Sequence, residues 1–530
     1  MEKIMISSNE NRKQNRFWLI FSLASTYLWG LAAHAYFLFD NNFTHDSLFE
    51  LNAAVYSNVF KYASGRFLVP FYRELFRTDI TLPWLVGILG LLWIGLTVFF
   101  IIRIFHIQSK SLCFLVAGVF TSNLTVSAII ATYLHDFDSD MLALLCATVA
   151  VYLWKNCPKG EFLGAIMIAI SLGLYQSYVF VTITLVIMVC IFALLDGDSF
   201  RTVLFRGFRA IVMILLGGII FFVDSKVVSN LTHVTLSSEF SKLGERSLEF
   251  TSKMFLEYSV GAYRNWASRL FNAYSAYPGN IVKMITLLLF GISTVSLAAG
   301  LLRKRVHKWE KLLCLVLIIL FPYGTNLIYV MFLGACHDLV VYAIWLFYLF
   351  ALLLADRLAK QWKDREQASK PMAKTGSYTK VLCMVLVFIL LYGNVQLSNG
   401  MYLEKDVQYD AYLSLMTRIT GRIEQEPDYI PEETPVVFIG LPEDWNENIP
   451  GFEKNDLITG MWATDLIFDP QPQRFQVYFD YVLCTPIKLA DDEQWYAMRE
   501  EPDIQAMPNY PAQGCMKMVD GILVVKLGDP

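Results

Sequence analysis

Charged residues are scarce in this chain: Asp, Glu, Lys and Arg together make up 17% of its 530 residues. Soluble globular domains usually carry about 25%. Hydrophobic residues make up 55% and recur in long apolar runs, many of them about 18 residues or more, a length that crosses a bilayer as a helix. The composition therefore excludes an ordinary soluble domain and indicates a multi-pass membrane protein. The formal net charge of −4, without a clustered basic surface, argues against a nucleic-acid partner.

Motifs for several common metal and nucleophile chemistries are missing. The nine cysteines include no C-x-x-C pair and show no zinc-ligand spacing. His45, His135 and His337 fall on the same predicted face of the membrane, but three separated histidines are no zinc signature. There is neither a G-x-S-x-G nucleophile motif nor a glycine-rich phosphate loop. Cys484 and Cys515 lie in the polar C-terminal tail, where a disulfide and two free thiols are equally open interpretations.

Apolar runs predict eleven membrane spans, of which the fourth to sixth are short. The first span is interpreted as a retained anchor, because no small-residue cleavage site precedes Asp40. With eleven spans, every basic loop falls on one side of the membrane, which places the N-terminus in the cytoplasm and the C-terminal tail outside. The predicted spans are residues 17–39, 82–104, 112–133, 139–154, 161–177, 179–195, 209–228, 281–302, 311–332, 339–356 and 379–397.

The first outer loop, residues 40–81, carries acids next to apolar spans, where charge is costly unless water or a partner stabilises it. Ser47 and Glu50 form a capping-box pattern, and apolar residues then recur at helical spacing up to Gly65. We therefore expect a short amphipathic helix along the membrane surface, with Asp46 at its N-terminal end. Asp46 can act there as a general base or simply complement the helix dipole.

A second acidic outer loop, His135–Asp140, contains Asp136, Asp138 and Asp140. Their carboxylates suit Mg²⁺ or Mn²⁺. Alternatively they cap the fourth span, with Ser139 or Asp138 at its N-terminus, and both interpretations remain open. Further candidates on the same face are Tyr175, Gln176 and Tyr178, the loop 229–280 with Arg264 and Arg269, and His337.

The tail, residues 399–530, is rich in Asp, Glu and Pro and contains no run of membrane length. We expect a small extracytoplasmic α/β domain there, distinct from the transmembrane domain of residues 1–398. The Asp520–Gly521 pair predicts a β-hairpin, because its turn needs positive φ. The tail is predicted to hold a helix over Val407–Gln425 and strands over Val436–Leu441, Phe475–Leu483 and Ile522–Leu527.

Acids beside membrane spans on an outer face suit transfer of a sugar from a lipid phosphate. An acceptor hydroxyl needs a carboxylate base as its proton leaves, and the departing phosphate needs cationic stabilisation. Asp46 is the predicted base, with Asp136 or Asp138 as the second acid. Arginine holds phosphate through paired hydrogen bonds, and the candidates are Arg66, Arg264 and Arg269. The predicted substrate contacts are Asp40, His45, Tyr175, Gln176, Tyr178 and His337.

An acid soon after the first span, a surface helix and then Gly65-Arg66-Phe67-Leu68-Val69-Pro70-Phe71-Tyr72 resemble the bacterial membrane glucosyltransferases of the serotype-converting, O-antigen-modifying type. These enzymes belong to the GT-C superfamily. The acidic second outer loop and the turn Tyr175–Tyr178 also fit this likeness, which covers the chain to about residue 397.

The resemblance implies a GT-C-like helical arrangement and a sugar donor on polyprenyl phosphate at the outer face of the bacterial cytoplasmic membrane. It also implies an inverting transfer to a glycan such as O-antigen or a cell-wall polymer. The superfamily's first-loop aspartate matches Asp46, and its second-loop acid matches Asp136 or Asp138. In the superfamily another acid often follows the first, whereas Ser47 stands here, which weakens the case for a metal at that position.

The implied partners are a polyprenyl-phosphate-linked sugar, an acceptor glycan, membrane lipids, and companion proteins that make and flip the donor. Catalysis with Mg²⁺ or Mn²⁺ and metal-independent catalysis both remain open. The main alternative function is a transporter or flippase of lipid-linked glycans, although such proteins favour polar breaks in mid-span, and the apolar runs here show few. A non-catalytic envelope scaffold would leave the clustered acids unexplained.

Overall fold

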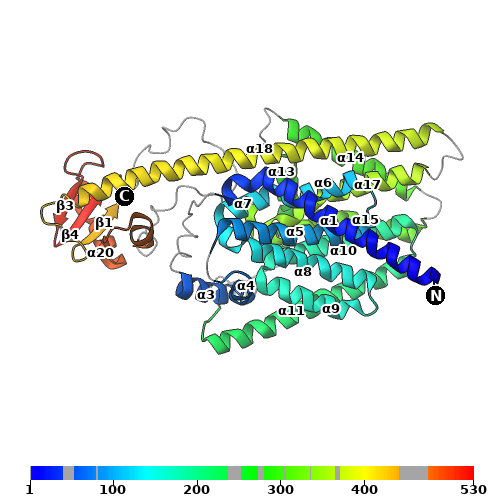
Figure 1. Ribbon diagram of the computed structural model, residues 1–530, viewed down its shortest axis with the longest axis horizontal. Coiled ribbons are helices and arrows are strands. Elements are labelled where there is room, and N and C mark those ends of the chain that lie inside the picture. The colour runs from blue at the N-terminus through cyan, green and yellow to red at the C-terminus, as the bar shows by residue number, and fades with distance from the viewer. Residues whose placement is uncertain are drawn as a thin grey trace. The chain divides into compact units, whose positions relative to one another are not determined.

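The computed structural model describes residues 2–39, 53–78, 81–236, 252–272, 280–302, 306–334, 336–363, 370–440 and 476–529. Within these ranges the chain is mainly helical, with one small sheet near the C-terminus (Figure 1). The helices up to residue 363 are α1 (Glu2–Leu38), α3 (Ala53–Ala63), α4 (Leu68–Phe76), α5 (Pro83–Phe105), α6 (Lys110–Thr121), α7 (Leu124–Tyr133), α8 (Phe137–Asn156), α9 (Gly160–Leu174), α10 (Val179–Asp196), α11 (Phe200–Thr232), α13 (Ser252–Phe271), α14 (Ile281–Leu301), α15 (Lys308–Thr325), α16 (Leu327–Met331) and α17 (Leu346–Lys363).

Eight helical segments within the described ranges are long and apolar enough to cross a membrane, so the multi-pass architecture is confirmed while the count of eleven is not. Three differences account for the gap. The predicted third and fourth spans merge into one apolar segment, Leu124–Asn156. Helix α9 is a shorter apolar helix of 15 residues. Helix α15 carries Lys308, Glu310 and Lys311 in its first turn. With these charged residues, the helix has no apolar stretch long enough to count as a membrane span.

The membrane helices pack in a layered order: α1 lies against α5, α5 against α8, α8 against α9, and α9 against α11 (Figure 1). Helix α10 packs against α8 and α15, and α14 against α17. In α10 83% of the apolar stretch is buried inside the protein, but only 17% in α11. Helix α10 is therefore central, while α11 presents most of its apolar surface outward, as a lipid-facing helix does.

The predicted third span, residues 112–133, is wrong as one helix. Helix α6 ends at Thr121, and the Asn123 side chain accepts a hydrogen bond from the Val126 backbone N–H at 3.0 Å, which starts α7. Between α7 and α8 lies only a 3₁₀ turn, Leu134–Asp136. The acidic loop predicted at His135–Asp140 is therefore helical, with Asp138 and Asp140 in the first turn of α8.

The surface helix predicted before Gly65 is present as α3, and Gly65 adopts φ 74° two residues after its end. Ser47 and Glu50, the predicted capping box, lie outside the described residues. The predominantly helical character predicted for residues 229–280 is confirmed over Ser252–Phe271, which form α13. The predicted ninth span is interrupted at Asn326, whose side-chain amide donates to the Ala262 carbonyl at 2.9 Å.

Helix α18 (Lys370–Ile423) is a single helix of 54 residues, about 80 Å long at 1.5 Å per residue. It joins the predicted last span to the predicted tail helix without a break. The chain nevertheless divides into two compact units inside this helix, after Asn399. Of the described residues, the second unit contains 400–440 and 476–529 with the short segments 53–58 and 131–133.

The second unit contains a four-stranded sheet in the order β2-β1-β4-β3. Strand β1 pairs in parallel with β2 and β4, and β3 pairs antiparallel with β4. Side chains alternate between two cores, one against the end of α18 and one against α20 and α21, as the period of two in a strand requires. The elements are β1 (Pro435–Ile439), β2 (Lys488–Leu489), α20 (Asp492–Glu500), α21 (Pro502–Gln505), β3 (Met516–Val519) and β4 (Ile522–Lys526).

Three features of the tail test the sequence predictions. The hairpin is confirmed, because Asp520 and Gly521 join β3 to β4 with φ of 48° and 78°. The strand predicted over Phe475–Leu483 is wrong: its described part is helical and ends in a π-helical turn. All nine cysteines are free thiols, so Cys484 and Cys515 form no disulfide.

Candidate functional site

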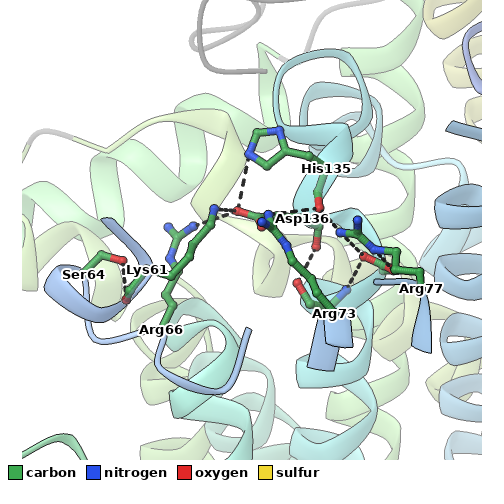
Figure 2. Close-up of polar contacts among 9 residues, drawn as sticks. Lys61, Ser64, Arg66, Arg73, Arg77, His135 and Asp136 are labelled. Atoms are coloured by element: carbon green, nitrogen blue, oxygen red, sulfur yellow. Dashed lines mark hydrogen bonds and ion pairs between the residues drawn. The ribbon is translucent and has the colours of Figure 1, made fainter. Parts of the chain in front are cut away.

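Asp136 is the centre of a buried cluster of charged side chains. It occupies the position that precedes α8, but its carboxylate makes no capping bond to that helix. Instead, Arg73 Nη2 donates to Oδ1 at 2.8 Å, and Lys61 Nζ donates to Oδ2 (Figure 2). Arg66 Nη1 lies 3.5 Å from Oδ2. The side chains of Lys61, Arg73 and Asp136 are each at most 3% exposed, so the ion pairs are shielded from water.

A second buried pair lies beside the first. Arg77 Nε donates to Asp138 Oδ2 at 2.8 Å, and its Nη2 lies 3.4 Å from Oδ1. The Ser139 backbone N–H donates to Asp138 Oδ1 at 2.9 Å. Arg77 also donates to the His135 carbonyl (Figure 2), and both paired side chains are fully buried. Asp138 is thus held by an arginine and by the first turn of its own helix.

The cations come from the segment between the first two membrane helices. Lys61 lies in the last turn of α3. After it, Gly65 takes a left-handed backbone conformation that other residues adopt only with strain, and the Arg66 N–H donates to the Lys61 carbonyl at 2.8 Å. This turn brings Lys61 and Arg66 to the same carboxylate. Arg73 lies in the last turn of α4, and Arg77 is the residue directly after that helix, where its backbone N–H donates to the Arg73 carbonyl.

Arg66 is the most exposed cation of this cluster, at 23% of its side chain. Its guanidinium lies over the Tyr175 ring, 4.4 Å from the ring centre, a contact that fixes its plane. Gln176 Nε2 donates to the Ser64 carbonyl at 3.2 Å and ties the Tyr175–Tyr178 turn to the α3–α4 turn. Burial raises the pKa of Tyr175 to about 12, so the phenol stays neutral beside the guanidinium. The structure therefore brings Arg66, Asp136, Tyr175 and Gln176 together.

Asp140 lies one helical turn beyond Asp136 on the same face of α8. Its side chain is buried, with 3% exposure, and its Oδ1 has no hydrogen-bond partner among the described residues. The Tyr178 hydroxyl is likewise buried without a partner in that part of the chain. The Tyr178 ring is tilted against Tyr175 and meets Tyr342 edge to face, with ring centres 5.6 Å and 5.4 Å away.

A metal held by Asp136, Asp138 and Asp140 does not fit these side chains. Asp136 and Asp138 direct their oxygens at Lys61, Arg73 and Arg77. Within the described ranges no group of three or more His, Cys, Asp or Glu side chains is arranged to hold a metal ion. The capping interpretation is wrong: Asp136 holds the N-cap position of α8 and makes no side-chain capping bond, while Asp138 and Ser139 lie inside the first turn.

The remaining described candidates lie apart from this cluster. Arg269, on α13, forms an ion pair with Asp338 and donates to the Cys336 carbonyl at 2.6 Å. His337 is exposed beside this pair, and Arg264 is exposed on α13. Asp40, His45 and Asp46 lie outside the described residues.

Sequence reasoning missed Lys61, Arg73 and Arg77 as part of the site. The signal was present, because four cations crowd into residues 61–77 of a loop predicted to lie outside, where basic residues are depleted. Cations in an outer loop beside an acidic segment suggest pairing. The partner of each cation could not be assigned, since the pairs join residues 61 to 75 positions apart.

A family model described as glucosyl transferase GtrII matches residues 35–353, which is more than half of the chain and includes every described member of the cluster. No curated protein matches the chain.

Proposed function

The chain belongs to the glucosyl transferase GtrII family, and we propose that it moves glucose from a polyprenyl-phosphate donor to a cell-surface glycan. The family makes the chain a glycosyltransferase of the membrane. The proposal goes beyond the family in three points: the donor is a lipid, the acceptor is a glycan, and the reaction takes place at the outer face of the bacterial cytoplasmic membrane. The donor would come from companion proteins that attach the sugar to the lipid and flip it outward.

The charged cluster beside α8 carries the proposal. A donor of this class is anionic at its phosphodiester and apolar in its chain. Arg66 is partly exposed, its plane is fixed by Tyr175, and it lies at the edge of the buried ion pairs of Asp136. A planar guanidinium held in place matches two phosphate oxygens. In this proposal Arg66 contacts the donor phosphate, while Lys61, Arg73 and Arg77 keep the surrounding turns in position.

The arrangement of basic side chains supports an outward-facing site. Lys155, at the end of α8, donates to the Ile104 carbonyl at the end of α5. Nearby, Trp154 Nε1 donates to the Arg206 carbonyl at 3.3 Å, and Arg357 pairs with Asp196. These residues lie at the opposite end of α8 from Asp136. Clustered Lys and Arg at helix ends favour the cytoplasmic side, so Asp136 and Arg66 would face outward.

The proposed reaction is an inverting substitution. The acceptor hydroxyl oxygen attacks the anomeric carbon, the bond from that carbon to the phosphate oxygen breaks, and the polyprenyl phosphate leaves with the bonding electrons. The hydroxyl proton passes to a carboxylate, for which Asp46 is our candidate. Arg66 stabilises the charge that develops on the departing phosphate. Tyr175, Gln176 and Tyr178 form the turn that contacts Arg66 and the α3–α4 turn, and they are proposed to orient the sugar.

Reconstitution of the full chain in vesicles tests the proposal. With polyprenyl-phosphate glucose and an acceptor glycan added on one side, we expect glucose on the glycan and free polyprenyl phosphate in equal amounts. Donor that crosses the bilayer unchanged, with no transfer, would instead identify a flippase and contradict the proposal.

Replacement of Asp46 tests the proposed base. Asp46→Asn keeps the size of the side chain but removes its basicity, so transfer should fall by about 10²-fold or more, while insertion and donor binding remain. Glu50→Gln, four residues further along the same loop, is the matched control and should retain transfer. Normal transfer by Asp46→Asn would remove Asp46 from the reaction without touching the family assignment.

A further inference from the structure

An apolar cavity of about 650 Å³ lies between α10, α11 and α15. It is lined by Leu204, Phe208 and Ile211 of α11, by Cys190 of α10 and by Leu317 of α15, together with a few neighbours. The side chains of Leu204, Phe208 and Ile211 are more than half exposed. They lie on a membrane helix, so this exposed surface faces lipid and not water.

One basic residue, Arg201, is found among the apolar residues that line the cavity. Arg201, in the first turn of α11, also lines the cavity and is exposed. Its neighbours Arg206 and Arg209 are paired with Asp198 and Glu161. Arg201, by contrast, has no carboxylate within salt-bridge distance in the described part of the chain. The cavity therefore has almost wholly apolar walls, and Arg201 is the charged residue among those that line it.

Two contacts join α11 and α15, two of the helices that line the cavity. The Phe200 backbone N–H donates to Glu310 Oε1 at 2.9 Å, and the Phe200 and Trp309 rings lie 6.3 Å apart. These contacts join the starts of α11 and α15. Gly207 contributes to the lining, and a Cβ added there would meet no atom within 4 Å. The space in front of Gly207 is therefore open, and no protein side chain fills it.

We propose that this cavity binds one anionic phospholipid of the inner leaflet, with an acyl chain between α11 and α15 and the headgroup phosphate on Arg201. A basic residue at the membrane surface attracts anionic lipids, and Arg201 lies at the end of the molecule that carries the other basic helix ends. Cys190 lies twelve residues after Tyr178, so the cavity is about 18 Å along α10 from Tyr178. This distance separates the lipid site from the proposed donor site, and the inference does not depend on the catalytic activity.

Lipid retention by the full chain tests the inference. The purified protein is equilibrated with phosphatidylglycerol in a phosphatidylcholine background, and bound lipid is measured by native mass spectrometry. We expect one retained phosphatidylglycerol per chain. Gly207→Leu places a side chain in the open space in front of Gly207 and should abolish that retention. Gly218→Leu is the matched control, because it makes the same change on the same helix at another position with open space around it, outside the cavity lining.

Removal of the charge tests the headgroup contact. One basic residue near the membrane surface contributes about 1 kcal/mol to binding of an anionic lipid, so Arg201→Gln should weaken phosphatidylglycerol retention about fivefold and leave phosphatidylcholine unchanged. Equal retention by the Gly207→Leu and Gly218→Leu proteins would overturn the site. Displacement of phosphatidylglycerol by polyprenyl phosphate would overturn the choice of a phospholipid as its occupant. Thermal unfolding of each variant separates lipid loss from misfolding.

Discussion

Asp136→Asn should destabilise the protein strongly, because Asp136 compensates two buried cations. The substitution keeps the size of the side chain and removes its charge. Lys61 and Arg73, each at most 3% exposed, would then lose their anionic partner. Removal of one member of a buried ion pair costs about 3–5 kcal/mol. At 1.4 kcal/mol for each tenfold change, the ratio of folded to unfolded protein should fall by about a hundredfold or more.

Asp140→Asn is the control for this prediction. It makes the same chemical change on the same face of α8, one turn away and at similar burial, but Asp140 Oδ1 has no hydrogen-bond partner in the described chain. Replacement of a buried carboxyl group that has no bonded partner at this oxygen should be nearly neutral or stabilising. Unfolding of the two purified variants by a denaturing detergent, followed through tryptophan fluorescence, gives the comparison. Equal stability of Asp136→Asn and Asp140→Asn would refute the argument from ion pairing.

Two further predictions concern the Cys336 turn and the C-terminal sheet. Burial raises the pKa of the Cys336 thiol to about 11, so its thiolate is scarce at pH 8. The rate of alkylation by N-ethylmaleimide should therefore keep rising about tenfold per pH unit beyond pH 9. A rate that reaches a plateau by pH 9 would contradict this burial. Gly521 has φ 78° in the β3–β4 turn, so Gly521→Val should lower the free energy of unfolding by about 1–2 kcal/mol and increase proteolysis of the tail. The control is Gly421→Val, in a helix with open space around it, which should leave the sheet protected from proteolysis. Unchanged cleavage of the Gly521→Val protein would show that valine causes no strain in this turn.

The parts of the fold that depend on local sequence could be predicted. Apolar runs gave α5, α10 and α14 to within a residue or two at most of their ends, because a membrane helix satisfies its backbone hydrogen bonds within itself. The Asp520–Gly521 turn was predictable for a similar reason, since the required backbone conformation is set by these two residues. Such features need no knowledge of distant neighbours.

Other elements depended on packing that the sequence does not reveal. The residues predicted as a strand over Phe475–Leu483 are rich in aromatic and β-branched side chains, which favour strands. In the structure Tyr478 and Phe479 are both buried in the core against α18, and adjacent buried residues suit a helix better than a half-buried strand. Tertiary contacts therefore overrode the local preference.

The candidate site was predictable in its chemistry but not in its geometry. Asp136, Asp138 and Arg66 stood out as charged residues beside apolar runs, and the structure places all three within two adjoining ion-pair groups. The acids were expected in a loop, yet Asp138 and Asp140 lie in a helix, because α8 begins directly after a 3₁₀ turn. Which cation meets which acid depends on how α4 packs against α8, and periodicity carries no information on that.

The donor dependence of Arg66 variants tests the central claim most directly. A hydrogen bond to a charged group contributes about 1.5–3 kcal/mol, so Arg66→Gln should raise the KM for polyprenyl-phosphate glucose about 10- to 150-fold, with the acceptor KM unchanged. Arg66→Lys keeps the charge but loses the planar contact with Tyr175. Its donor KM should lie between those of the unaltered protein and Arg66→Gln. Arg264→Gln, at an exposed position of α13, provides a matched comparison for the loss of charge. A donor KM for Arg66→Gln equal to that of the unaltered protein would contradict the account.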